Sequence, residues 1–379
     1  MTLNAHYDWI VVGAGIIGSL AAWRLAQKGL SVALVDAGSP GQQATAAAAG
    51  ILSPLAEATA SGSFVKLMHM SLQRYPTMIA ELIKESGMDL QYHTSGVLQV
   101  AHEEDREQLR HRYTWQEPLG AQWVDQTELK KLEPHLIGYS AAIYDPTESQ
   151  VHPPLLVQAA VRAALARGVT PYFGSPVRSL VTHNDTVQGV ALPSQDLLAH
   201  HGVVIAAGAW SGLVTDLLQH RLPVVPIRGQ VISVKQDQQV FRHIIFHGHT
   251  YLVPKRDGRL VVGATEDVAG FDSRVTTKGL TRLSEILHSF GLSESNVYVE
   301  RLWAGLRPKS ADGLPVLGPW PGRKGLYLAT GHYRNGVLLS VLTADIISGW
   351  ATGQPDPMDL TPFQPGRFWN TNSTKERRQ

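Results

Sequence analysis

Residues 8–18 read Asp-Trp-Ile-Val-Val-Gly-Ala-Gly-Ile-Ile-Gly, an apolar run that enters the spacing Gly13-x-Gly15-x-x-Gly18. In a strand-turn-helix unit, Gly13 permits the tight turn, Gly15 lets a pyrophosphate approach the backbone, and Gly18 lets the helix pack close to the sheet. The N–H groups and the positive dipole end of that helix face the phosphates. The stretch therefore predicts a dinucleotide site at the start of the chain.

The residues that follow complete this pattern. Residues 19–27 are predicted to form a helix that ends at Gly29, and the apolar residues 32–35 are predicted to form a second strand. Asp36 stands at the end of that strand, where a carboxylate can accept hydrogen bonds from ribose hydroxyls. Because strand, helix, strand and acid occur in this order, the pattern favours a nucleotide site over a merely tight turn.

The composition is that of an ordinary globular enzyme. The chain has 379 residues, more than one core usually holds, which favours two domains. Its 33 Lys and Arg residues balance 32 Asp and Glu residues, so neither a nucleic-acid surface nor a strongly anionic partner is indicated. The absence of cysteine excludes disulfides, thiolate catalysis and thiolate metal sites.

The ends of the chain carry no clear targeting signal. The apolar residues 10–23 are too few to span a bilayer, and the glycine motif occupies the place of a signal-peptide cleavage site. We therefore expect a cytoplasmic protein. Residues 370–379 are polar and are expected to form a disordered tail, with a surface anchor as the lesser alternative.

Three separated stretches of chain predict one buried sheet. The apolar runs 202–208 and 325–331 both end in glycine, as buried parallel strands do, and both are expected to return to the first sheet. Further strands are expected at 96–100 (with alternating burial), 169–173, 187–192, 230–234, 250–254 and 259–263, and helices at 64–86, 103–113, 127–132, 157–166, 280–290 and 336–352. In the helical stretch 64–86, the expected buried face is Leu67, Met70, Tyr75, Ile79, Leu82 and Ile83.

This order of elements predicts an α/β (α+β) chain with two interleaved domains. A Rossmann-like nucleotide domain comprises residues 1–86, 150–222 and 308–369, and a β-rich domain comprises residues 87–149 and 223–307. The site is expected between the two layers.

Three further segments could carry chemistry, although each has a plain alternative. The Ala-rich residues 44–51 would let a cofactor approach the backbone, or would form a simple helix. Residues 331–336 could direct N–H groups at a phosphate or an electron-rich ring, or form an ordinary turn. Arg307 supplies the two-pronged donor that an amino-acid carboxylate needs, or is exposed.

Two other patterns are set aside. His243, His247 and His249 have a spacing that could suggest a metal site, but they lack a nearby acid in the sequence, so structural or surface roles are favoured and no metal is expected. Residues 208–212 read Gly-Ala-Trp-Ser-Gly, in which the serine is displaced from the centre of a nucleophile elbow. A hydrolase is therefore rejected.

Six short motifs are spread over the chain. They are Gly-Ala-Gly-Ile-Ile-Gly at 13–18, Ala-Ala-Ala-Ala-Gly-Ile at 46–51, Gly-Ala-Thr at 263–265, Ala-Gly-Leu-Arg-Pro at 304–308, Asp-Gly at 312–313 and Gly-His-Tyr-Arg-Asn-Gly at 331–336. Together they resemble the FAD-dependent amine oxidoreductases of the D-amino-acid oxidase family, and most closely the glycine oxidases of thiamine biosynthesis. The resemblance covers about residues 7–368 and implies FAD, where the glycine spacing left NAD and FAD open. Without cysteine, no thiolate can tether the flavin.

The resemblance implies that the first domain binds FAD and that the second binds substrate. Arg307 would hold the substrate carboxylate, Tyr251 would add a hydrogen bond, and Arg334 would lie near the same group. The sequence alone favours a core or strand position for Tyr251, so its role rests on the resemblance. The implied FAD contacts are Gly13, Gly15, Ile16, Ile17, Gly18, Asp36, Ala37, Ala44, Thr45, Ala49, Gly50, Ile51, Val177, His332, Tyr333, Arg334, Asn335, Gly336, Val337 and Leu338.

The implied reaction is oxidative deamination of glycine, sarcosine or small D-amino acids. A hydride passes to flavin N5 without a protein base, and dioxygen is reduced to hydrogen peroxide. The resemblance also suggests a homotetramer and handover of the glycine imine to a thiazole synthase. The alternatives are a D-amino-acid or sarcosine dehydrogenase with another electron acceptor, and a flavin-binding protein without turnover. Glu266 and Asp267 would either face the substrate amine or lie on a solvated loop.

Overall fold

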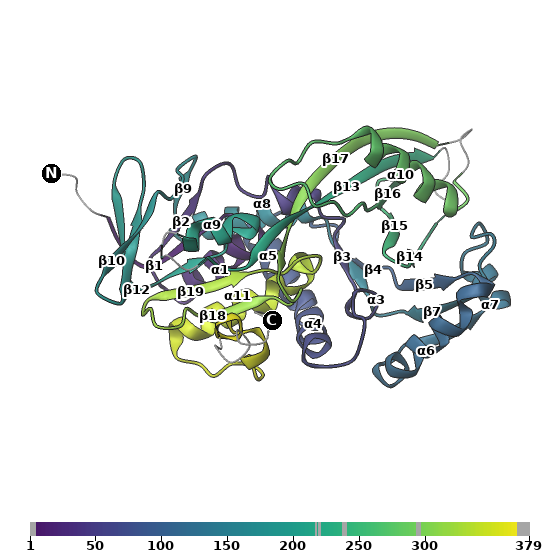
Figure 1. The fold of residues 1–379 in the computed structure, drawn as a ribbon, viewed down its shortest axis with the longest axis horizontal. Coiled ribbons are helices and arrows are strands. Elements are labelled where there is room, and N and C mark those ends of the chain that lie inside the picture. The colour runs from purple at the N-terminus through teal and green to yellow at the C-terminus, as the bar shows by residue number, and fades with distance from the viewer. Residues whose placement is uncertain (1–4, 217, 219–220, 237–240, 293–296, 370–379) are drawn as a thin grey trace, which may run out of the picture.

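Two large β-sheets organise the chain and lie toward opposite ends of an elongated molecule (Figure 1). The structure is a computed structural model that describes residues 5–216, 218, 221–236, 241–292 and 297–369. The tail expected at 370–379 lies outside the described residues. The mixed α/β fold that the sequence predicts is confirmed.

The first sheet has eight strands around a parallel centre in the order β9-β2-β1-β12-β19. The predicted runs 202–208 and 325–331 do return to it, as the end of β12 and as β19, although β12 begins earlier than expected. The strands are β1 (Ala5–Val12), β2 (Val32–Asp36), β9 (Thr170–Phe173), β10 (Ser179–His183), β11 (Thr186–Ala191), β12 (Asp196–Ile205), β18 (Val316–Pro319) and β19 (Leu326–Thr330). β18 pairs antiparallel with β19, and the hairpin β10-β11 pairs with the start of β12.

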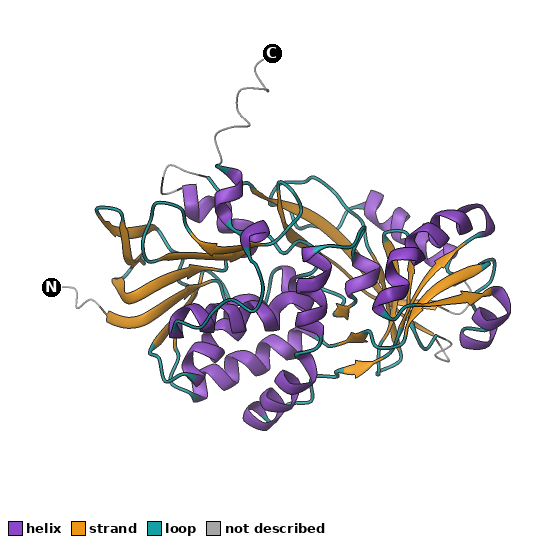
Figure 2. Cartoon of the chain, turned by 90° about the horizontal axis from the view of Figure 1, so that it is seen from below, coloured by secondary structure: helices purple, strands orange, loops and turns teal. Residues whose placement is uncertain are grey.

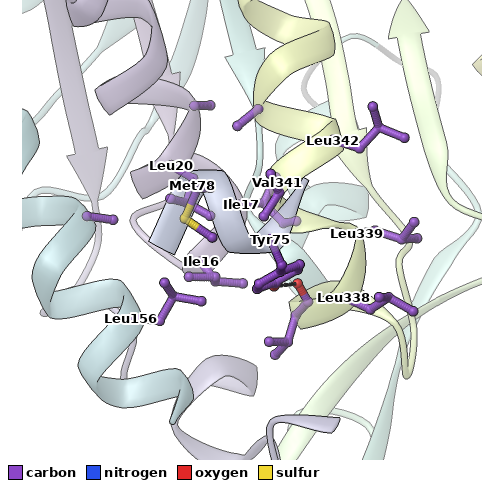
Figure 3. Packing of buried hydrophobic residues seen from close by; sticks show 14 of the residues in the cluster. Ile16, Ile17, Leu20, Tyr75, Met78, Leu156, Leu338, Leu339, Val341 and Leu342 are labelled. Carbon is purple, nitrogen blue, oxygen red and sulfur yellow. Dashed lines mark hydrogen bonds between the residues drawn. The ribbon is translucent and has the colours of Figure 1, made fainter. Parts of the chain in front are cut away.

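Five helices share one hydrophobic core with this sheet, and Figure 2 shows helices gathered on one side of its strands. They are α1 (Ile16–Gln27), α4 (Ser63–Leu72), α5 (Tyr75–Ser86), α8 (Pro153–Ala166) and α11 (Gly336–Thr352). α1 packs against both α8 and α11. Figure 3 shows the core of this contact, where Ile17 of α1, Tyr75 of α5 and Val341 of α11 come together. The Tyr75 hydroxyl donates a hydrogen bond to the carbonyl of Val337, which ties α5 to the first turn of α11.

The helical stretch 64–86 is two helices, not one. Pro76 lies in the first turn of α5, where the missing N–H costs nothing, whereas inside a continuous helix it would break the hydrogen-bond ladder. Of the expected buried face, Met70 is only partly buried and Ile83 is 41% exposed. The other members, Leu67, Tyr75, Ile79 and Leu82, are buried as predicted.

Helix α1 begins at Ile16, three residues before the predicted start. Gly15 takes the extended conformation of an N-cap residue, so the helix starts directly at the glycine motif and Gly18 lies inside it. The end of the helix, followed by Gly29 with φ +76°, agrees with the prediction.

The second sheet also has eight strands, in the order β17-β13-β16-β15-β14-β5-β7-β6. Both predicted insertions contribute to it, because β14 from the second pairs in parallel with β5 from the first. The strands are β5 (Val97–Ala101), β6 (Gln122–Asp125), β7 (Ala141–Asp145), β13 (Val224–Gln236), β14 (Ile244–His247), β15 (Thr250–Pro254), β16 (Arg259–Gly263) and β17 (Val297–Ser310), with helices α6 (Arg106–Gln116), α7 (Gln126–Leu132) and α10 (Thr277–Ser289). Two separate insertions therefore build one sheet.

The alternation predicted for residues 96–100 is wrong, because β5 is buried on both faces. Gln99 is 5% exposed, and its side-chain amide donates a hydrogen bond to Gln116 of α6 at 2.8 Å. A buried amide is tolerated there because it has a hydrogen-bond partner.

Short elements connect the two sheets. β3 (Ile51–Leu52), β8 (Ser149–Gln150) and β4 (His93–Thr94) form a three-stranded sheet, and the remaining α-helices are α2 (Ala44–Ala47), α3 (Pro54–Glu57) and α9 (Ser211–Asp216). The 3₁₀ turns are Glu103–Asp105, Glu117–Leu119, Gly208–Trp210, Thr361–Phe363 and Pro365–Phe368. Within the described ranges, no helix has the length and apolar character needed to cross a bilayer.

Candidate active site

A single cavity of about 490 Å³ is lined by residues of both large sheets. Gly13 and Asp36 line it from the first sheet, and Tyr251 and Arg307 line it from the second. The site therefore lies between the two layers, where the sequence places it.

Glycine is required at the turn between β1 and α1 for steric reasons. Gly13 has φ +106°, and a Cβ there would lie 2.4 Å from the carbonyl oxygen of Ala206 in the neighbouring strand connection. A Cβ on Gly18 would lie 1.8 Å from the carbonyl oxygen of Gly13. A Cβ on Gly15 would meet nothing closer than the Thr45 hydroxyl, at 3.6 Å, and Gly15 faces the cavity. The backbone at Gly15 is thus open to a ligand.

Asp36 holds the same turn in place. One carboxylate oxygen accepts a hydrogen bond from the N–H of Ala14 at 2.7 Å, and the other accepts one from the N–H of Gly38 at 2.8 Å. Each oxygen has further acceptor capacity toward the cavity that Asp36 lines. Asp36 can therefore bind a ribose hydroxyl while it orders the glycine turn, a second role that the sequence reasoning missed.

The cavity has the electrostatic character that FAD requires. Helices α1 and α11 both begin at its wall, and their N-cap residues, Gly15 and Asn335, make no capping side-chain hydrogen bond. Two positive helix ends therefore face the cavity, one suited to a pyrophosphate and one to a ring that takes up negative charge. Tyr333 lines the cavity at φ +49°, and its buried hydroxyl has no hydrogen-bond partner among the described residues. The residues present thus fit the cofactor.

Residues 44–51 combine the two alternatives that the sequence left open. Ala44–Ala47 form a single helical turn, α2, and the chain becomes extended at Ala48. Gly50 has φ +83°, and a Cβ there would lie 2.0 Å from the carbonyl oxygen of Val151. The small side chains of this segment face the cavity, so a cofactor can lie close to the backbone.

Arg307 is a partly buried cation with no carboxylate partner among the described residues. One of its terminal nitrogens donates a hydrogen bond to the Thr265 carbonyl at 3.1 Å, and no acid among the described residues forms an ion pair with it. Burial lowers the pKa of the Arg307 guanidinium. Burial also raises the pKa of the neighbouring Tyr251 phenol, which therefore stays protonated and can donate a hydrogen bond. A partly buried guanidinium without such an ion pair, beside a hydroxyl donor, is suited to bind a carboxylate.

Arg334 lines the same cavity but is already paired. Its Nε donates to Glu57 Oε2 at 2.8 Å and its Nη2 donates to Glu57 Oε1 at 3.2 Å, in a two-pronged contact. The Glu57 carboxylate raises the pKa of Arg334. Sequence reasoning missed Glu57, whose only signal was an isolated acid close after the Ala-rich segment.

Most of the expected site residues line the cavity. Gly18, Asn335 and Leu338 do not: Gly18 packs against Gly13, Asn335 precedes α11, and Leu338 is in the core. Those that line it are Gly13, Gly15, Ile16, Ile17, Asp36, Ala37, Ala44, Thr45, Ala49, Gly50, Ile51, Val177, Tyr251, Arg307, His332, Tyr333, Arg334, Gly336 and Val337.

The two acids after the Gly-Ala-Thr motif do not line the cavity. Glu266 is exposed, in agreement with the solvated-loop alternative. Asp267 accepts hydrogen bonds from Gln230 at 2.9 Å and Thr265 at 3.1 Å, and lies 3.6 Å from Arg228. Asp267 therefore has a structural role in the loop.

The histidines for which no metal is expected, and the serine of residues 208–212, have structural contacts. His243 does have an acidic partner, Glu133, which is distant in sequence and lies 2.7 Å from its ring nitrogen. His247 packs against Tyr139. The described part of the chain holds no group of three side chains arranged to ligate a metal. Ser211 is buried and donates to the Thr330 hydroxyl at 2.8 Å, which leaves it unsuited to act as a nucleophile.

The chain is similar to known proteins over nearly its whole length. The family described as DAO, FAD dependent oxidoreductase, matches residues 8–350. Glycine oxidase of Bacillus licheniformis is 33% identical over 359 residues, covering 93% of this chain and 95% of the relative. The bifunctional protein ThiO/ThiG of Synechocystis sp. is 32% identical and covers 97% of this chain and 55% of the relative. The crystal structure of glycine oxidase from Geobacillus kaustophilus superimposes with a TM-score of 0.90 at 32% identity, over 96% of this chain and 99% of that chain. The chain belongs to the DAO family of FAD-dependent oxidoreductases.

Proposed function

We propose that this enzyme oxidises glycine and other small amines, such as sarcosine and small D-amino acids, to the corresponding imines. The observation that carries the proposal is the partly buried Arg307 beside Tyr251, in the same cavity as the glycine turn at Gly13 and without an ion pair to any described residue. Near full-length similarity to glycine oxidases supports it.

In this proposal the substrate carboxylate lies on the guanidinium of Arg307. A planar guanidinium can donate two parallel hydrogen bonds, and burial strengthens them because water competes less. Tyr251, 6% exposed, adds its hydroxyl hydrogen bond. Together the two donors fix the orientation of the substrate, and orientation accounts for much of the rate enhancement in such a reaction.

The first sheet would hold FAD without a covalent bond. Gly15 and the start of α1 would bind the pyrophosphate, Asp36 the ribose, and Val177 the adenine end. The flavin ring would lie against His332, Tyr333, Arg334, Gly336 and Val337, and the start of α11 there favours negative charge. When bound, FAD would supply the redox chemistry, accepting a hydride from the substrate Cα and passing the two electrons to dioxygen to give hydrogen peroxide.

We assign no protein base. His332 lines the cavity, and burial lowers its pKa to about 3, so it is neutral at physiological pH. Its ring nitrogen lies 3.1 Å from the Thr343 hydroxyl of α11, which fixes the ring. The substrate amine would react in its neutral form, and the product imine would hydrolyse to glyoxylate and ammonia when glycine is the substrate.

The decisive experiment is anaerobic titration of the FAD-loaded enzyme with glycine, sarcosine, D-alanine and D-proline. Loss of the flavin absorbance, followed by peroxide formation on admission of oxygen, is the expected result. Bleaching without peroxide, but with reduction of a dye, would favour the alternative of a dehydrogenase. A yellow protein that none of these amines bleaches would be a flavin-binding protein without turnover, and the proposal would be wrong.

We also propose a partner, a cellular location and an oligomeric state for the enzyme. The ThiO/ThiG relative joins a similar chain to a second part, which supports handover of the glycine imine to a thiazole synthase. We further propose a cytoplasmic homo-oligomer, with a first domain that binds FAD and a second that binds substrate. Light scattering of the FAD-loaded protein would test for the tetramer.

A further inference from the structure

Two guanidinium groups face one cavity, and within the described part of the chain only one of them has an acidic partner. Arg307 has no acidic partner among the described residues, whereas Arg334 is held by both oxygens of Glu57. The two cations affect each other, since the charge of Arg334 contributes to the lowered pKa of Arg307. Both also act on Tyr251, so the three side chains surround a common space.

We infer that Glu57 determines substrate specificity by occupying Arg334, so that the enzyme accepts amines with one carboxylate and rejects those with two. This inference rests on the proposed function. Two guanidinium cations and one carboxylate leave one unit of positive charge in the site, which matches one substrate carboxylate. A second substrate carboxylate would meet the negative charge of Glu57, and like charges at close range in a partly buried site repel strongly.

Contacts at both ends of helix α3 hold Glu57 in place beside Arg334. Glu57 is the last residue of this one-turn helix. At the N-terminal end of α3, the Ser53 hydroxyl accepts a hydrogen bond from Ala56 N–H at 3.2 Å and Glu148 accepts one from Leu55 N–H at 2.8 Å. At the other end, Arg112 donates to the carbonyls of Leu55, Ala56 and Ala58 at 3.1, 2.8 and 2.7 Å.

The positive charge of Arg112 at the C-terminal end of α3 also matches the helix dipole. With α3 fixed at both ends, Glu57 cannot readily move away from Arg334. Arg334 is further held by the carbonyl of His249, at 3.3 Å. A dicarboxylic amine would therefore have to displace an ordered ion pair.

Sarcosine and iminodiacetate form the matched pair of substrates for the test, because iminodiacetate is sarcosine with one added carboxylate. The FAD-loaded wild type and Glu57→Gln are compared for the rate of anaerobic flavin bleaching by each amine. The ratio of kcat/KM for iminodiacetate to that for sarcosine is expected to rise on the order of tenfold or more in E57Q, the scale of one released charge-assisted hydrogen bond. Binding of malonate and acetate, followed by flavin absorbance, should shift in the same direction without turnover.

Glu266→Gln is the control variant. Glu266 is exposed and acts electrostatically on both Arg307 and Arg334, but it forms no ion pair with either among the described residues. The E266Q variant removes the same unit of negative charge as E57Q but leaves the Glu57–Arg334 ion pair intact. The ratio of kcat/KM for iminodiacetate to that for sarcosine should therefore stay at the wild-type value. An equal rise in E57Q and E266Q would show a general charge effect and overturn the inference.

A double variant and a conservative variant complete the design. The gain in E57Q should disappear in E57Q/R334M, because the second carboxylate then has no cation to bind. If E57Q does not fold with FAD, Glu57→Asp keeps the charge but shortens the side chain, and a smaller rise in the ratio is expected. If a folded Glu57 variant keeps the wild-type ratio of kcat/KM for the two amines, only the inference about Glu57 is wrong. If neither sarcosine nor glycine bleaches the flavin of the wild type, the proposed function is wrong.

Discussion

Gly229 and Arg307 are in direct contact across the pairing of β13 and β17. A Cβ on Gly229 would lie 2.4 Å from Cζ and from both terminal nitrogens of the Arg307 guanidinium. The two strands pair along their whole length, with Gly229 opposite Gly305. The missing side chain of Gly229 therefore provides the space in which the guanidinium lies.

Gly229→Ala should displace Arg307 without unfolding the protein. Gly229 lies in a strand and does not have positive φ, so alanine is compatible with its backbone. Because a displacement of about 1 Å at a positioning group can reduce the rate about 100-fold, we expect a large loss of kcat/KM for glycine with unchanged FAD content. Gly349→Ala in α11 is the control, since a Cβ there meets no atom closer than 3.8 Å. Wild-type kinetics in G229A would contradict this prediction.

Arg307→Ala should weaken substrate binding more than Arg307→Lys does. Loss of a buried charge partner costs about 2 to 5 kcal/mol, which corresponds to a fall in kcat/KM of about 30-fold or more. Lysine restores the charge but not the two-pronged geometry, so recovery should be partial. Arg301→Ala, an exposed position on the same strand, serves as the control. Steady-state kinetics with glycine measure the effect, and equal kinetics for R307A and wild type would remove Arg307 from the carboxylate site.

Gly15→Ala should reduce the affinity for FAD, whereas Gly18→Ala should reduce the stability of the protein. The Cβ in G18A would lie 1.8 Å from the carbonyl oxygen of Gly13 in the turn before α1, so α1 must move and the apoprotein should be destabilised. The Cβ in G15A has room in the protein but faces the cavity, so the apoprotein should keep its stability and lose affinity for FAD. Thermal unfolding of the apoproteins and fluorescence titration with FAD separate the two effects. A G15A protein that binds FAD as tightly as wild type would place the cofactor elsewhere.

Glu148 should make stability depend on pH. Burial raises the pKa of its carboxyl from the ordinary 4.5 to about 8. In the unfolded chain the pKa returns to its ordinary value, so between about pH 4.5 and pH 8 the folded state holds a proton that the unfolded state has lost. The free energy of unfolding contributed by this group therefore falls as the pH rises through that window.

Glu148→Gln removes this titration while it keeps an acceptor for the N–H of Leu55. Denaturant unfolding of E148Q should show a smaller decline in stability between about pH 5 and pH 8 than the wild type. Glu104→Gln, on the exposed start of the α6 region, is the control and should follow the wild type. The same decline in E148Q and wild type would contradict the assigned pKa.

Local sequence patterns predicted much of the fold. The apolar stretch after Gly331 predicted α11 at its observed bounds, 336–352, and the glycine-ended runs predicted the strands that return to the first sheet. Errors arose where burial does not follow a local period, as at Gln99, or where one proline splits a helical pattern, as at Pro76. Packing, not propensity, decided these positions.

The sequence by itself determined the glycine turn, the βαβ unit that contains it, and the residue types suited to a nucleotide and a carboxylate. These features depend on φ angles, strand and helix periods and side-chain chemistry, all of which act within a few residues. The tertiary structure alone decided that Glu57 pairs with Arg334, 277 residues away, that His243 has an acidic partner, and that two insertions form one sheet through β14 and β5. Such contacts join distant segments, so they exist only once burial has brought those segments together and removed the competing water.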